Sequence, residues 1–214
     1  MRNEFGFGDS DPVLVAGSTH PKEEQFVLEA FTQLRTEFPS LQLVIAPRHI
    51  ERADSVQELV HSYGYSVYRR SHAKNGQPQP EPAGPQARVV ILDTIGELSR
   101  VYALATVVFV GGSIARVGGH NILEPLAQGK PVIVGPYTHN FREIVAVAKH
   151  YGLVEEVRSP KELEAAVSEF LRNRQRVSEI AARAQEMLSR ERQAAARIAD
   201  ALVELLHRAR AVQV

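Results

Sequence analysis

The residues most able to do chemistry gather in residues 111–130, where two glycine pairs enclose a short polar loop. A strand-like apolar run, residues 106–110, leads into this loop. His120, Asn121 and Glu124 follow it. Glycine lets a backbone approach a ligand closely and adopt positive φ at low cost, and a helix N-terminus after such a loop offers unpaired N–H groups to a phosphate. The stretch therefore predicts a nucleotide-binding edge of an α/β sheet.

Pro125 decides how the end of this stretch is interpreted. Asn121 and Glu124 stand three residues apart, as in a capping box. With Asn121 as N-cap, however, Pro125 would fall where the helix needs an N–H, and proline has none. We therefore predict a helix that starts near Leu123 and leaves Asn121 in the loop. For this pair we favour ligand contact over capping, with the Glu124 carboxylate accepting the two hydroxyls of a ribose.

A second group of polar residues, Arg48, His49 and Arg52, follows the apolar run 41–46. An arginine at a strand-to-helix turn can bind phosphate in a forked geometry, and a histidine can add a donor. The alternative is a solvated turn that Glu51 partly neutralises. The residue types alone leave both interpretations open.

Two further polar loops lie at residues 17–20 and 93–97. In the second, Asp93 and Thr94 precede Gly96, and we favour a simple cap of the next helix. Parallel strands end at one edge of a sheet, and ligands of open α/β sheets bind at that edge. The four loops are therefore expected to converge.

No residue set resembles a Ser-His-Asp triad, a metal cluster or a dinucleotide-binding G-x-G-x-x-G after a first strand. The eight histidines are scattered along the chain. His49 and His120 lie in promising loops, but neither has a visible partner that would make it a base. We predict no catalytic residue, no metal site and no cofactor in this chain.

Strand-length apolar runs alternate with amphipathic helix-length segments, which predicts one Rossmann-like, three-layer α/β/α domain over residues 1–214, with a parallel sheet. The expected strands are residues 12–16, 41–46, 65–69, 88–92, 106–110, 131–134 and 153–157. The expected helices are residues 21–38, 51–63, 95–103, 123–129, 140–151, 160–173 and 175–210.

Two segments stand apart in composition. Residues 72–87 hold four prolines, which predicts a surface loop inserted within the domain and free of helix and strand. The helix at residues 175–210 is rich in Ala, Arg and Glu and carries both charge signs. We favour a packing or interdomain helix over a membrane or calmodulin-like role.

Composition narrows the function classes. Lys+Arg and Asp+Glu balance at 25 each, so no net field attracts nucleic acid or an anionic membrane. No apolar run approaches the ~20 residues that a membrane span needs, and the first ten residues lack a signal-peptide core. The chain contains no cysteine, which is compatible with a reducing cytoplasm. We expect a soluble chain in the cytoplasm.

Five segments in order resemble the bacterial 3-deoxy-D-manno-octulosonic acid (Kdo) transferases, glycosyltransferase family 30. They are Ala-Gly-Ser-Thr-His (16–20), Pro-Arg-His-Ile-Glu-Arg (47–52), Asp-Thr-Ile-Gly-Glu-Leu (93–98), the glycine-pair segment ending in His-Asn-Ile-Leu-Glu-Pro (111–125), and residues 136–143 with Asn-Phe-Arg-Glu. The resemblance covers most of residues 12–150. It implies the C-terminal, donor-binding half of a GT-B fold, in which two Rossmann-like domains face each other across a cleft.

The resemblance also implies an activity. These enzymes transfer Kdo from CMP-Kdo to a lipid A precursor in lipopolysaccharide synthesis. In this chain, helix ends and arginine can take the electrostatic place of a metal. The resemblance further implies that the N-terminal acceptor domain, which carries the catalytic base, is absent from this chain. The parent protein is expected at the cytoplasmic face of the bacterial inner membrane.

The resemblance implies a CMP-Kdo site lined by Ser18, Arg48, His49, Thr94, Gly96, Glu97, Gly112, Ser113, Gly119, His120, Asn121 and Glu124. We expect the phosphate among Ser18, Arg48, Ser113 and Asn121, and the ribose at Glu124. Backbone N–H groups and Arg48 would stabilise the departing phosphate. The alternatives are a GT-B glycosyltransferase or epimerase that uses a UDP-sugar, and a non-catalytic nucleotide-binding module.

Overall fold

The computed structural model describes the backbone of residues 1–76 and 88–211, and side chains up to residue 193. Within these residues, seven parallel strands form one sheet in the order β3-β4-β2-β1-β5-β6-β7. The strands are β1 (Val13–Thr19), β2 (Gln42–Pro47), β3 (Ser66–Arg69), β4 (Arg88–Ile91), β5 (Val107–Val110), β6 (Val132–Val134) and β7 (Val154–Glu156).

Helices connect the strands. They are α1 (Arg2–Phe5), α2 (Glu23–Glu37), α3 (Ala53–Ser62), α4 (Arg70–Lys74), α5 (Leu98–Tyr102), α6 (Leu123–Ala127), α7 (Arg142–His150), α8 (Pro160–Arg172) and α9 (Arg174–Ala211), with 3-10 turns η1 (Ile50–Arg52) and η2 (His139–Phe141).

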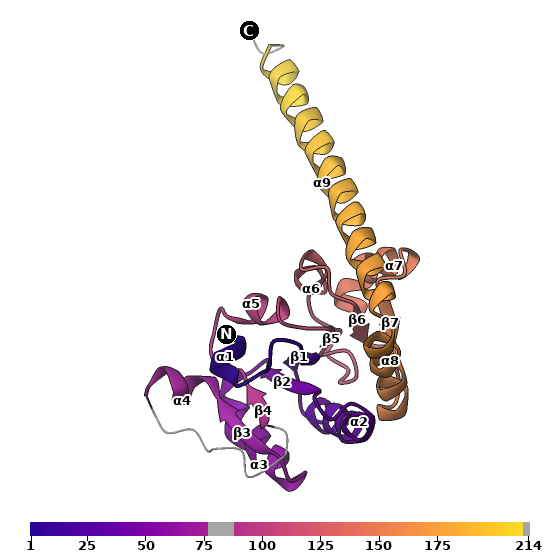
Figure 1. Cartoon of the computed structure of the whole chain (residues 1–214). Helices are drawn as coiled ribbons and strands as arrows, with labels where there is room; N and C mark the ends of the chain where they lie inside the picture. The colour runs from indigo at the N-terminus through magenta and orange to yellow at the C-terminus, as the bar shows by residue number, and fades with distance from the viewer. Residues whose placement is uncertain (77–87, 212–214) are drawn as a thin grey trace.

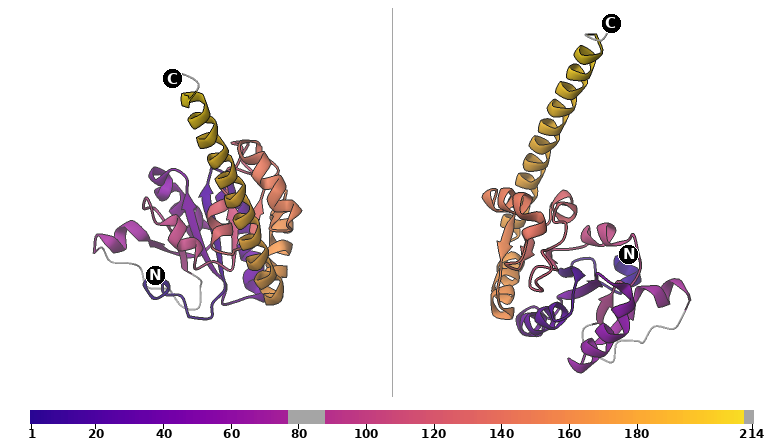
Figure 2. Two further views of the ribbon diagram at one scale, coloured as in Figure 1. Left: turned by 90° about the horizontal axis from the view of Figure 1, so that it is seen from above. Right: turned by 180° about the vertical axis from the view of Figure 1, so that it is seen from behind.

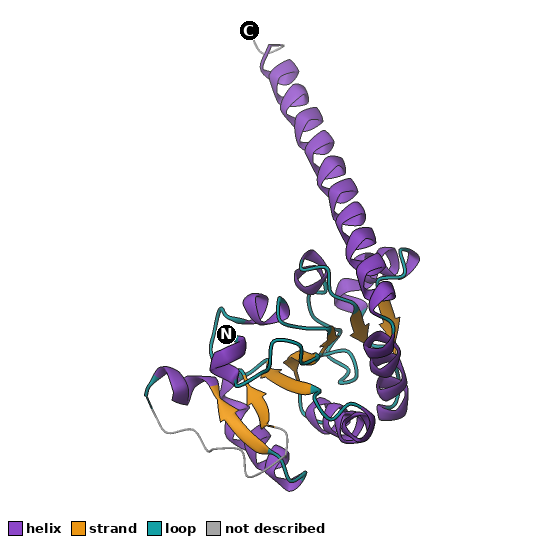
Figure 3. Ribbon diagram, in the orientation of Figure 1, coloured by secondary structure: helices purple, strands orange, loops and turns teal. Residues whose placement is uncertain are grey.

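The chain changes direction between β1 and β5. It builds β2, β3 and β4 on one side of β1 and then returns to place β5, β6 and β7 on the other. Such a reversal opens a crevice at the carboxyl ends of the strands, where ligands of open α/β sheets bind. The loops that follow β1, β2, β4 and β5 all leave the sheet at this edge (loops are teal in Figure 3). The predicted convergence of the four loops is confirmed.

Helices cover both faces of the sheet, which confirms the predicted three-layer, Rossmann-like fold (Figure 1). On one face α2 packs against α8, and Phe26 of α2 stacks on Phe109 of β5. On the other face α5 contacts β1 and α6. The first turns of α9 bury Ile180 and Met187 against the domain, while its distal half projects away from the body (Figure 2).

Four helices start two or three residues later than predicted; α3 and α7 follow the 3-10 turns η1 and η2. The helix expected from residue 21 begins at Glu23, because Pro21 lies in a turn and Lys22 has a φ of 77°. The helix expected from residue 95 begins at Leu98, because Gly96 has a φ of 83°. The last helix spans Arg174–Ala211, close to the predicted 175–210. Within the described residues, no helix is both long and apolar enough to cross a bilayer.

The prediction that residues 72–87 contain no helix is wrong at its start. Residues 72–74 belong to α4, whose N-terminal turn is anchored where Ser71 donates to Asp93 from its backbone N at 2.8 Å and from its hydroxyl at 2.5 Å. The prolines begin only at residue 78, so they do not disturb this helix. Residues 77–87 lie outside the described part of the chain.

Gly17, in the middle of β1, lies directly beneath the ring of Tyr102. A Cβ at Gly17 would come within 2.1 Å of the Tyr102 hydroxyl and 2.8 Å of its ring carbon. We expect Gly17→Ala to destabilise the domain by about 2 kcal/mol through overpacking, measured by urea unfolding. Combined with Tyr102→Leu, it should cost less than the sum of the two single changes. Additive losses would contradict this contact.

Candidate functional site

A cleft of about 140 Å³ lies at the carboxyl edge of the sheet, between the loops that follow β1, β2 and β4. Four of the predicted site residues line it: Ser18, Arg48, Thr94 and Gly96. Its walls also contain apolar side chains that are open to solvent, since Ile50 is 39% exposed and Ile95 84% exposed. Apolar walls beside a cationic side chain suit a ligand with both a ring and an anionic group.

Ser18 reaches this cleft through an irregularity in β1. The pairing of β1 with β2 shifts register between Gly17 and Thr19, and Ser18 has a φ of 54°. A non-glycine residue in this left-handed region costs about 1 kcal/mol. Strain of this kind is often kept where a side chain must be aimed at a ligand.

Arg48 presents its guanidinium at the cleft. Its backbone N donates to Thr19 O at 2.9 Å, which fixes the start of the turn after β2. Its side chain is exposed and forms no hydrogen bond or ion pair with any residue that the structure describes. Arg48 is therefore available to an anionic ligand.

The prediction that Arg52 joins Arg48 and His49 in one cationic group is wrong. Arg52 binds both oxygens of Glu24, at 2.8 and 3.1 Å, and Thr19 also donates to this carboxylate. Glu24 is only 1% exposed, so the charge of Arg52 is used to neutralise a buried acid.

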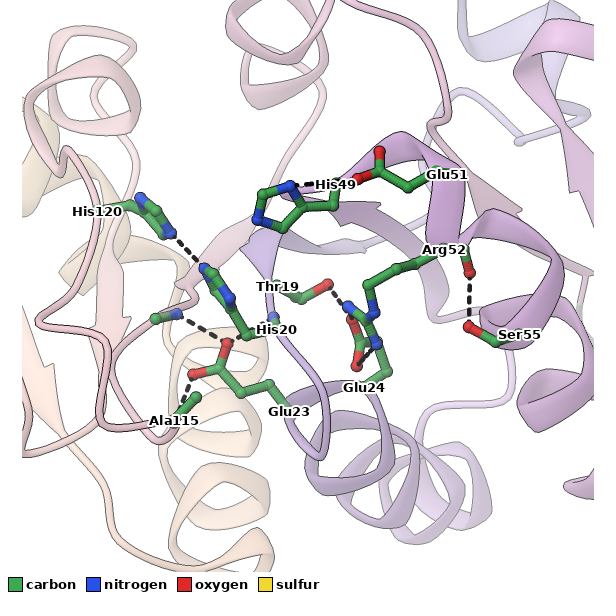
Figure 4. A network of polar contacts seen from close by, with 11 residues as sticks. Thr19, His20, Glu23, Glu24, His49, Glu51, Arg52, Ser55, Ala115 and His120 are labelled. Atoms are coloured by element: carbon green, nitrogen blue, oxygen red, sulfur yellow. Dashed lines mark hydrogen bonds and ion pairs between the residues drawn. The ribbon is translucent and has the colours of Figure 1, made fainter.

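Three histidines, His20, His49 and His120, meet at this edge, contrary to the expectation that they are scattered and without partners (Figure 4). The Nε2 atoms of His20 and His120 lie 2.8 Å apart. The ring of His49 meets the ring of His20 edge-on, with centroids 5.8 Å apart. The sequence analysis did not select His20, because 100 residues separate it from His120 and no local spacing links them.

This surrounding keeps the paired rings uncharged. Burial, together with the neighbouring His20, Arg48 and His49, lowers the pKa of His120 to about 4. Burial also lowers the pKa of His20. At neutral pH one ring nitrogen of the pair therefore donates its proton to the other. The charge of Arg48 is among the groups that lower the His120 pKa.

A buried glutamate, Glu23, holds the glycine loop. It is 0% exposed and accepts hydrogen bonds from the backbone N of Gly112 and His20 on Oε2 and from Ser113, Ile114 and Ala115 on Oε1, at 2.7 to 3.1 Å. The expectation that backbone N–H groups of this segment bind a phosphate is therefore wrong for residues 112–115, whose N–H groups an internal carboxylate already occupies. For the helix N-terminus that follows the loop, it stays a prediction. In the sequence, Glu23 resembles any acidic residue in the first turn of a helix.

The expectation that Ser113 binds phosphate is also contradicted. Its side chain is 0% exposed, and its hydroxyl donates to Val110 O at 2.6 Å and accepts from Gly135 N at 2.8 Å. Ser113 thus joins the loops that follow β5 and β6.

Gly112 and Gly119 shape the loop. The backbone N of Gly119 donates to Gly112 O at 2.8 Å, which closes the loop on itself. A Cβ at Gly112 would lie 2.9 Å from the His120 ring. The glycines therefore let His120 lie directly on the loop backbone, within reach of His20.

The helix α6 begins at Leu123, as the position of Pro125 predicts. Asn121 Oδ1 accepts from Leu123 N at 2.9 Å, and its amide donates to Glu124 at 3.4 Å. Asn121 therefore supports the helix start, as a capping residue does, and the preference for ligand contact over such a role is not met by this geometry. Asn121 and Glu124 are both exposed, and contact with a ligand stays a prediction.

The cap predicted for Asp93 is wrong. Asp93 accepts from Ser71 and from Arg69, at 2.7 Å, and so anchors β3 and α4 instead of α5. The structure also turns Glu97 away from the cleft. Burial would raise the Glu97 pKa, but hydrogen bonds from Arg70, Thr94 and Lys74 outweigh it and hold the pKa at about 2.

The sequence matches a family model, Glycosyl transferases group 1, over residues 3–187. The chain belongs to this family. It is 35% identical to the 3-deoxy-D-manno-octulosonic acid transferase of Haemophilus influenzae over 92% of this chain and 45% of that protein. It is 33% identical to the enzyme of the same name from Aquifex aeolicus, over 74% of this chain and 41% of that protein. The glycosyl transferase chain thus spans less than half the length of these relatives.

A solved structure matches the chain more completely. The C-terminal CMP-Kdo binding domain of WaaA from Acinetobacter baumannii is 30% identical, with a TM-score of 0.77 over 87% of this chain and 93% of that one. The resemblance to the Kdo transferases, drawn from five sequence segments, is confirmed. The glycosyl transferase fold is that of a GT-B C-terminal domain.

Lowering the pH should reduce the folding stability of this glycosyl transferase domain, because the folded chain disfavours protonation of His120. Its pKa is about 4 when folded and ordinarily 6.5, so between these values the unfolded chain binds a proton that the folded chain does not. We expect the free energy of unfolding to fall as pH drops from 6.5 to 4, and His120→Gln to flatten that slope.

Urea unfolding at several pH values measures the slope. His61→Gln, on the exposed surface of α3, is the matched control and should leave the slope unchanged. An equal slope in the His120 variant and the unmodified chain would contradict the assignment.

Proposed function

We propose that this chain is the donor-binding domain of a Kdo transferase and that its cleft binds CMP-Kdo. The observation that carries the proposal is the similarity to the WaaA domain, which is named for CMP-Kdo binding and which this chain covers over 93% of its length. The cleft beside Arg48 supports it, because a free guanidinium between apolar walls suits a nucleoside monophosphate.

Each part of the donor would have a partner in the cleft or on the neighbouring loops. Arg48 and Ser18 would bind the phosphate, with a further donor from His49 or the His20–His120 pair. Glu124, exposed in the first turn of α6, would accept the ribose hydroxyls. The base would lie against the exposed side chains of Ile50 and Ile95.

The proposed reaction is a substitution at the anomeric carbon of Kdo. An acceptor hydroxyl oxygen forms a bond to that carbon, and the bond from the carbon to the phosphate oxygen breaks with its electron pair leaving on CMP. The acceptor's proton passes to a base on the acceptor side of the parent enzyme. The charge that develops on the departing phosphate is stabilised by Arg48, which no carboxylate of the described residues neutralises.

The partners follow from the same proposal. The acceptor would be a lipid A precursor, held by an N-terminal domain of the parent protein at the cytoplasmic face of the inner membrane. The chain described would supply the donor half of the site. By itself it would bind CMP but would not transfer Kdo.

The first test is calorimetric titration of the chain with CMP and UDP. We expect CMP to bind more tightly than UDP and Arg48→Ala to weaken CMP binding by about 10- to 100-fold, as for loss of a charge-assisted bond. Arg172→Ala is the matched control, since Arg172 pairs with Glu37 at the far end of α2 and should not alter binding. Preference for UDP would favour a UDP-sugar enzyme or epimerase, and no binding by the folded chain would overturn the proposal.

We also propose that donor binding needs no metal. Among the described residues, no group of three or more His, Asp or Glu side chains is arranged to hold a metal ion, and Arg48 would supply the positive charge instead. CMP affinity should therefore be the same, within about 2-fold (under 0.5 kcal/mol), in EDTA and in millimolar Mg²⁺. Loss of binding in EDTA that Mg²⁺ restores would contradict this.

A further inference from the structure

Glu23 lies at the point where the chain changes direction in the sheet. It is the first residue of α2, directly after β1, yet its side chain reaches into the loop after β5. Its five hydrogen-bond donors are all backbone N–H groups, four of them consecutive from Gly112 to Ala115. No lysine or arginine within the described residues forms an ion pair with it.

Consecutive N–H groups that point at one spot form a concave site that attracts an anion. Here the anion is part of the protein. The backbone is fitted closely around it, because a Cβ at Gly111 would lie 2.7 Å from Glu23 Oε2 and 2.5 Å from Ser18 O. The carboxylate therefore replaces an external anion as the centre on which the loop folds.

The same carboxylate joins the two loops that carry the histidine pair. Glu23 Oε2 accepts from the backbone N of His20 at 2.9 Å and from Gly112 at 2.7 Å, and Gly112 lies against the His120 ring. Figure 4 shows Glu23 between His20 and the loop at Ala115, with His20 pointing to His120. Among the described residues, the hydrogen bonds of Glu23 are the direct link between the loop from Gly112 to Ala115 and the turn after β1, and the His20–His120 contact joins the same two loops further along.

We infer that Glu23 is a positioning residue: it fixes the glycine loop so that His120 meets His20 beside Arg48, and it thereby pre-forms the donor cleft. The effect on the donor rests on the proposed function. The effect on the loop and on the histidine pair does not.

The neighbouring Glu24 provides a matched control. It is as buried as Glu23, at 1% exposed, and it also accepts several hydrogen bonds. Its partners are Thr19 and Arg52, on the side of α2 that faces away from the glycine loop (Figure 4). Glu23→Gln and Glu24→Gln therefore remove the same charge from the same depth, but only the first loosens the loop.

The experiment is NMR on the whole chain, with imidazole titration and amide hydrogen exchange. In E23Q we expect amides 112–115 to exchange at least about 10-fold faster, because an NH₂ group replaces an acceptor oxygen. We also expect the His120 pKa to rise from about 4 toward 6.5 as the ring becomes solvated. Glu23 and Glu24 are not among the groups whose charge directly shifts the His120 pKa, but both raise the pKa of its partner His20. E24Q therefore controls for the loss of charge, and a change seen only in E23Q reports position.

E24Q should leave both signals as they are. A folded E23Q with unchanged exchange and unchanged His120 titration would overturn the inference, as would an equal change in E24Q. If E23Q does not fold, amide hydrogen exchange in the unmodified chain tests the inference instead. Amides 112–115 must then be as protected as those of β5, and rapid exchange at these amides would overturn the positioning role of Glu23.

CMP titration extends the test to the donor. We expect E23Q to bind CMP about 10-fold more weakly and E24Q to bind it within about 3-fold of the unmodified chain. If the unmodified chain binds no CMP, the proposed function fails, while the NMR result still decides the role of Glu23. If E23Q loosens the loop but binds CMP normally, the pre-formed cleft is contradicted.

Discussion

The site depends on one interaction, the set of five backbone N–H groups that converge on the Glu23 carboxylate. Parallel strands bring the loops after β1 and β5 to the same edge, but topology alone leaves a glycine-rich loop many conformations. A buried carboxylate removes that freedom, because leaving either the acid or the N–H groups unpaired away from water costs several kcal/mol. The glycines make the close approach possible, and Glu23 makes it the preferred state.

The other buried acids of this edge are neutralised by cationic side chains instead, each from a different element. Glu24 is held by Arg52, Asp93 by Arg69, and Glu97 by Arg70 and Lys74. These pairs tie α2 to η1 and β4 to the β3–α4 junction below the cleft. The histidine pair adds no charge at neutral pH, since burial and neighbouring cations lower its pKa. Arg48 thus remains as a cationic side chain at the cleft with its donors open to a ligand.

Much of this arrangement follows from the sequence. The order of apolar runs and polar loops predicts the parallel sheet and the meeting of four loops, and Pro125 predicts the start of α6. Local context places Arg48 at the end of a strand, but it leaves the role of the side chain open, and the expected contact with phosphate comes from the family resemblance. The five sequence segments also predict the family.

What the sequence could not predict are side chains whose roles depend on partners far along the chain. Glu23 acts on residues about 90 positions away, and His20 pairs with a residue 100 positions away. Ser113 lies in the expected loop, but its burial beneath Gly135 depends on how β5 and β6 pack. The same limit applies to Glu97 and Asp93, whose partners come from β3 and α4.

A crystal structure of the chain with CMP tests the account most directly. The account predicts the phosphate beside Arg48 and Ser18, with the Glu23 carboxylate still bound to the N–H groups of residues 112–115. A phosphate seated on those N–H groups, with Glu23 displaced, would contradict it.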